Sequence, residues 1–136
     1  LVSPWLDLTC SSQSFRRNAR SDPVIKKEAL LNIAQVYLGR AGAGAASAAS
    51  PLRAPSKAFS QMPPTLIHVD ARESLLDDSR RLEAKLRSAH APVRLREWRS
   101  TLHGWHVLYP IFEPAEEAIA EVVSFLSDHL FEVGGI

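Results

Sequence analysis

The chain has 136 residues, of which 46% are hydrophobic and 23% charged, and its formal net charge is +1. This length fits one domain, and the charge balance gives no electrostatic reason to expect nucleic acid or an anionic membrane as a partner. No apolar run approaches the roughly 20 residues that span a bilayer. A single cysteine, Cys10, excludes an internal disulfide.

The first half of the chain predicts one helix between irregular segments. Residues 1–8 indicate the end of a strand and a turn, because Pro4 has no N–H for a ladder, and the polar, basic stretch 9–21 indicates an exposed loop. Asp22 and Pro23 are typical of a helix start. Residues at helical spacing continue this helix to Leu38, with an apolar stripe of Ile25, Leu30, Ile33, Val36 and Tyr37. Small residues over 39–50 predict a mobile loop, and a proline-punctuated connection follows over 51–64.

The second half predicts strands alternating with helices. Residues 65–69 are typical of a strand buried on both faces, and 93–98 alternate as a strand does. Between them, 75–89 form a helix with one apolar face, and Asp77 and Asp78 lie in its first turn. A last helix opens at Glu113, with a predicted inner stripe of Ala118, Ile119, Val122, Val123, Leu126 and Leu130. This order predicts an α/β fold with parallel strands joined by right-handed crossovers.

An acid and an imidazole follow the two predicted strands. Glu73 comes soon after the first strand and His103 soon after the second. Because ligands bind beyond the carboxyl ends of parallel strands, we expect both side chains on one rim, within hydrogen-bonding distance. Such a pair is two thirds of a nucleophile–histidine–acid triad. Asp70 and Asp77 are alternative acids. The alternative to a catalytic pair is that His103 is an exposed turn histidine and that Glu73 is a carboxylate stabilised at a helix N-terminus.

Other residues are candidates for binding. Trp5, Trp105 and Leu108 are candidate substrate-binding residues, since ligand pockets are mostly apolar, with ordinary core packing as the alternative. His103 and His106 have the spacing of a metal-binding pair. No cysteine or third close histidine completes a first shell, so no metal is expected.

Short motifs occur along nearly the whole chain. In order they are SPWLDL (3–8), DP (22–23), YL (37–38), SPL (50–52), PPT (63–65), ESLLDD (73–78) and HGWH (103–106). Together they resemble the C-terminal part of α/β-hydrolase-fold esterases of the hormone-sensitive-lipase-like branch. The resemblance implies the tail of strand six, a loop and helix connection over 9–62, and strand seven, a helix, strand eight and the C-terminal helix over 63–136.

The resemblance also implies a function. Members of this branch are serine carboxylester hydrolases of short to medium acyl esters, with no metal or organic cofactor. Their acid follows strand seven in the pattern acid–any–Leu–any–Asp, which gives Glu73 that role, and His103 fits the place of the histidine. Asp70 stands where a glycine is common and is a second carboxylate near the site. Neither a Gly-x-Ser-x-Gly nucleophile elbow nor a His-Gly-Gly oxyanion loop occurs in these 136 residues.

Because the chain begins in mid-pattern at Leu1, without signal-peptide anatomy, we expect a fragment whose partner is the missing N-terminal part of the same fold. We expect it to be inactive alone and, with an open sheet edge, to self-associate. Because no targeting segment is visible, we expect a cytoplasmic location. Segments 9–21 and 39–50 are expected near the site entrance. The alternatives are a non-catalytic half-domain that binds a partner and a relative with peptide or transferase chemistry.

Overall fold

The computed structural model describes residues 1–39, 42–99 and 101–130. The chain divides into two compact units, Leu1–His103 and Gly104–Ile136, which are described separately. The first unit contains α1 (Ser14–Arg17), α2 (Lys27–Leu38), α3 (Gly42–Ala48), η2 (Pro51–Arg53), η3 (Ser56–Phe59), β1 (Thr65–Asp70), α4 (Leu76–Ser88) and β2 (Val93–Trp98). The second contains η4 (Trp105–Leu108) and α5 (Glu113–Leu130).

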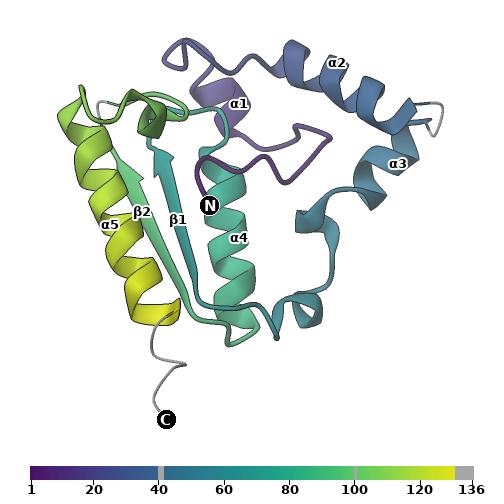
Figure 1. Cartoon of the computed structure of the whole chain (residues 1–136). Helices are drawn as coiled ribbons and strands as arrows, with labels where there is room; N and C mark the ends of the chain where they lie inside the picture. Colours follow the sequence, from purple (N-terminus) through teal and green to yellow (C-terminus); the bar gives the residue numbers. More distant parts are fainter. Residues whose placement is uncertain (40–41, 100, 131–136) are drawn as a thin grey trace. The chain divides into compact units, whose positions relative to one another are not determined.

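The first unit contains a parallel pair of strands, β1 and β2 (Figure 1). β1 and β2 pair from Thr65↔Val93 to Asp70↔Trp98, so both strands end at the same edge of the sheet. The N-terminal segment adds a parallel bridge between Val2 and His68. The two strands, their direction and the strand end before Pro4 are confirmed. All six residues of β1 are buried, as its apolar run predicts.

The helix α4 connects the strands and packs on both of them. Its bounds lie within a residue of the predicted 75–89. Two arginine–glutamate bonds between Arg80 and Glu97, of 2.6 and 2.8 Å, fasten α4 to β2. The core beneath α4 consists of Leu52, Phe59, Ile67, Leu82, Leu86 and Ala91. The core residues from η2 and η3 show that the proline-punctuated connection packs against the sheet unit.

The segment 9–21 is not the exposed loop that its polar composition predicts. It contains α1, and Cys10 and Phe15 belong to a buried cluster with Leu30 and Leu75. Asn18 is buried as well. The side chain of Phe15 therefore packs this segment against the core. Residues far away in the sequence form hydrogen bonds with its polar groups.

The turn at Asp22 is also different from the prediction. α2 begins at Lys27, and the Oδ1 atom of Asp22 accepts hydrogen bonds from the N–H groups of Val24 (3.0 Å) and Ile25 (2.9 Å). These are capping-type bonds, but they close a turn ahead of the helix.

The helix that the apolar spacing predicts up to Leu38 is confirmed as α2, but its apolar residues do not all lie on a buried face. Leu30 is buried, whereas Ile33, Val36 and Tyr37 are 54%, 84% and 77% exposed. Leu30 and Ala34 are the buried residues of α2, and Leu30 packs in the cluster that contains Phe15.

Residues 42–48 form α3 instead of the predicted mobile loop, and 40–41 lie outside the described residues. The helix propensity of alanine outweighs the cost of the glycines here. At the end of α3, the hydroxyl of Ser50 donates to the carbonyl of Ala46 and accepts the N–H of Leu8 at 2.8 Å. These bonds tie α3 to the N-terminal segment.

In the second unit, η4 packs on α5. The indole N–H of Trp105, a fully buried side chain, donates to the carbonyl of Pro114 at 3.2 Å. α5 begins at Glu113 as predicted, and Ala118 is buried. Ile119 and Val122 of the predicted inner stripe are half-buried, whereas Val123, Leu126 and Leu130 are 57%, 43% and 62% exposed, so the prediction is wrong for these three. The four residues of η4 are too few to cover an 18-residue helix.

Candidate active site

Glu73 lies in the turn between β1 and α4 and is 2% exposed. Its own N–H donates to the carbonyl of Asp70 at 3.1 Å, which tightens the turn. The carboxylate oxygen Oε1 accepts the hydroxyl of Ser3 (2.7 Å) and the N–H of Asp70 (2.8 Å). The other oxygen, Oε2, lies 3.0 Å from Nδ1 of His103. The contact predicted between Glu73 and His103 is confirmed.

His103 reaches Glu73 from the segment after β2, and its side chain is 28% exposed. With Glu73 ionised, Nδ1 carries the proton and donates it to Oε2, so Nε2 is the ring nitrogen that can accept a proton. The hydrogen bond with Glu73 raises the pKa of His103, partial burial opposes this, and the negative charges of Glu73 and Asp22 add to the rise. This is the arrangement of an imidazole base oriented by a carboxylate.

Asp70, the alternative acid, has other partners. Its Oδ2 accepts the N–H (2.9 Å) and hydroxyl (2.7 Å) of Thr101, and its Oδ1 accepts the N–H of Arg72 at 2.8 Å. Burial raises the pKa of this carboxyl, but the bonds from Thr101 and Arg72 outweigh it and hold the pKa below its usual value. Asp70 therefore ties the segment that carries His103 to the turn that carries Glu73.

The segment 14–22 holds the turn around Glu73 in place, a role that the sequence did not reveal. The amide of Asn18 donates to the carbonyls of Ala71 (3.2 Å) and Glu73 (2.7 Å). Oδ2 of Asp22 accepts the N–H of Ser74 at 2.7 Å, and the hydroxyl of Ser14 donates to the carbonyl of the same serine at 2.6 Å. The motif DP was the one visible signal of this contact.

The remaining candidate residues have the following contacts. Asp77 accepts the N–H of Ser14 at 2.8 Å and pairs with Arg17. The Trp5 indole donates to the carbonyl of Asp7 at 3.0 Å, and this ring packs on the cluster around Phe15. Trp105 is fully buried and Leu108 partly buried in the second unit. Their predicted role in substrate binding stays a prediction.

No group of three or more His, Cys, Asp or Glu side chains suited to a metal ion occurs among residues 1–39, 42–99 and 101–130.

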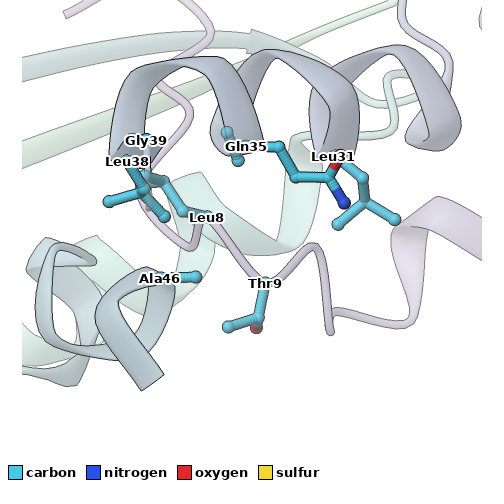
Figure 2. Close-up of a pocket in the computed structure, with 8 residues that line it drawn as sticks. Leu8, Thr9, Leu31, Gln35, Leu38, Gly39 and Ala46 are labelled. Atoms are coloured by element: carbon cyan, nitrogen blue, oxygen red, sulfur yellow. The ribbon is translucent and has the colours of Figure 1, made fainter. Parts of the chain in front are cut away.

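A separate cavity of about 410 Å³ opens between α2, α3 and the N-terminal segment (Figure 2). Its lining is mostly apolar and consists of Leu8, Thr9, Leu31, Ala34, Gln35, Leu38, Gly39 and Ala46. Thr9 and Ala46 belong to the two segments predicted near the site entrance. They face one cavity, but neither Glu73 nor His103 lines it.

The first unit is therefore an α/β protein with a parallel strand–helix–strand unit and a carboxylate–histidine pair beyond the strand ends. The α/β hydrolase fold family matches residues 1–107. The chain is 31% identical to an acetyl-hydrolase of Streptomyces hygroscopicus and 32% identical to an esterase of Acinetobacter venetianus, over 92% of the chain in each case. The crystal structure of an esterase from the bacterial hormone-sensitive lipase family matches 94% of the chain, with a TM-score of 0.86 and 36% identity.

The chain belongs to the α/β-hydrolase fold family, in its hormone-sensitive-lipase-like branch. It spans 40% of the length of both curated relatives and 42% of that crystal structure. Within the part of the chain that the structure describes, no helix has the length and apolarity to cross a membrane.

Proposed function

We propose that Glu73 and His103 are the acid and the base of a serine–histidine–acid triad in a carboxylester hydrolase. The observation that carries the proposal is the 3.0 Å bond between Nδ1 of His103 and Oε2 of Glu73, at the edge where both parallel strands end. The burial of Glu73 keeps this bond away from competing water. The esterase relatives support the same reaction class.

In the proposed reaction, Nε2 of His103 takes the proton of a serine hydroxyl as that oxygen attacks the ester carbonyl. The imidazolium then gives the proton to the departing alcohol oxygen, which leaves an acyl-serine. A water molecule, deprotonated by the same nitrogen, hydrolyses this acyl-enzyme and returns the serine. Glu73 stays ionised throughout, holds the tautomer of His103 and stabilises its positive charge.

The serine and the oxyanion donors are proposed to come from polypeptide outside these 136 residues, because neither of their motifs occurs in the sequence. The substrates are proposed to be small carboxylic esters, in line with the acetyl-hydrolase and esterase relatives. No cofactor takes part in this chemistry.

The proposal is tested by the reading frame upstream of the Leu1 codon and by ester hydrolysis. We expect that frame to encode Gly-x-Ser-x-Gly and His-Gly-Gly, and its product to hydrolyse p-nitrophenyl butyrate. The 136-residue chain alone is expected to give no rate above buffer. Turnover by this chain alone would contradict the proposal. A stop codon followed by a start codon at this point would favour the non-catalytic binding module instead.

A further inference from the structure

Ser3 contacts the carboxylate of Glu73 from the N-terminal segment. Its side chain is buried, at 3% exposure, and its hydroxyl donates to Oε1 of Glu73 at 2.7 Å. The backbone N–H of Ser3 donates to the carbonyl of His68 in β1 at 2.8 Å, so the sheet fixes where this hydroxyl lies. The sequence motif SPWLDL includes this serine, but the triad chemistry assigns it no task.

We propose that Ser3 is a positioning residue, whose hydroxyl holds the Glu73 carboxylate so that Oε2 faces His103. This inference rests on the proposed function, because it concerns the acid of that triad. It assigns Ser3 no contact with substrate.

The geometry of the carboxylate is the first argument. A glutamate side chain has one more rotatable bond than an aspartate, so its carboxylate needs more contacts to be fixed. With the N–H of Asp70 as its only donor, the carboxylate could still rotate about this additional side-chain bond. The Ser3 hydroxyl is a second donor to the same oxygen, from a segment 70 residues away in the sequence. Two donors from different directions leave Oε2 in one orientation.

The backbone of Ser3 is the second argument. Its φ is +42°, in the left-handed region that favours glycine. A glycine would adopt this conformation more easily but would have no hydroxyl for Glu73. The advantage of serine over glycine at this position is therefore its hydroxyl group.

The first test is the NMR titration of His103 in the 136-residue chain, compared with Glu73→Gln, Ser3→Ala and Ser3→Gly. If Ser3 orients Glu73, the pKa of His103 in both Ser3 variants lies between those of wild type and Glu73→Gln. If the Ser3 hydroxyl donates to Glu73 without orienting it, removing this hydrogen bond makes the Glu73 carboxylate more basic. The pKa of His103 then stays the same or rises, which would overturn the proposal.

Controls separate orientation from folding. Ser3→Gly suits the left-handed backbone, so it decides the question where Ser3→Ala fails to fold. Ser3→Ala in the Glu73→Gln background is expected to leave the pKa of His103 where Glu73→Gln puts it, because the effect passes through the carboxylate. Ser88→Ala, on the exposed side of α4, is the matched serine control, and the pKa of His103 in this variant should equal that of wild type.

The second test is ester hydrolysis by the longer protein of the upstream reading frame. Ser3→Ala is expected to lower kcat about tenfold with KM unchanged, as for a group that acts on the transition state. If Glu73→Gln abolishes activity while Ser3→Ala keeps all of it, only the role of Ser3 fails. If Glu73→Gln is itself fully active, the proposed function fails.

Discussion

Replacing His103 by glutamine in the longer protein that the upstream reading frame is proposed to encode is expected to lower kcat/KM for p-nitrophenyl butyrate by about 10⁴-fold or more. Glutamine has no nitrogen that can take and return the serine proton. Glu73→Gln is expected to lower kcat/KM by about 10³- to 10⁴-fold, because the amide no longer stabilises the imidazolium or fixes its tautomer. Stopped or continuous p-nitrophenol release measures both variants.

The control for these variants is His90→Asn. His90 is exposed and has a φ of +59°, which asparagine tolerates, so this variant should keep the wild-type rate. The pH profile gives a further check. The base must be neutral, so kcat/KM should rise with pH, and its midpoint should lie above the ordinary pKa of 6.5 because Glu73 raises the pKa of His103. A full rate in His103→Gln would contradict the assignment.

Replacing Asp7 by alanine is expected to destabilise the chain by about 3 kcal/mol, the largest effect expected outside the site. Asp7 is fully buried. Its Oδ1 accepts the N–H (3.1 Å) and hydroxyl (2.6 Å) of Thr9, and its Oδ2 accepts Ser11 (2.8 Å) and Arg81 (3.0 Å). Alanine leaves these donors without their acceptor. Urea unfolding of the 136-residue chain measures the difference.

The pH dependence of this effect has a definite sign. Burial raises the pKa of Asp7, but hydrogen bonds from Thr9, Ser11 and Arg81 outweigh it, so the folded pKa lies below the unfolded one. The stabilisation is therefore complete above the unfolded pKa of about 4 and is lost as the pH falls below it. Asp128→Ala, at an exposed position of α5, is the control and should change stability little. Equal stability of Asp7→Ala and wild type at pH 7 would contradict the expectation.

The central unit of the fold and the acid–histidine pair were predictable from local patterns. The continuous apolar run of β1 and the apolar face of α4 each indicate one kind of element. Parallel strands bring their carboxyl ends to one edge, so the residues that follow them meet there. Glu73 and His103 could therefore be paired from position alone.

The surroundings of the pair could not be predicted, because their contacts join residues far apart in the sequence. Ser3, Asn18 and Asp22 bond to the turn around Glu73 across 70, 55 and 52 residues. Nothing in the composition of their segments distinguishes these three buried side chains from solvated ones. The sequence did not predict α3 for a different reason. The high helix propensity of its alanines and the low helix propensity of its glycines nearly balance.

The most direct measurement of the acid–base assignment is kcat/KM of the double variant Glu73→Gln/His103→Gln in the longer protein. If Glu73 acts only through His103, the double variant should match His103→Gln within about twofold, because residues that act as one unit are not additive. A double variant whose loss equals the product of the two single losses would show that the two side chains work independently. That result would contradict the triad.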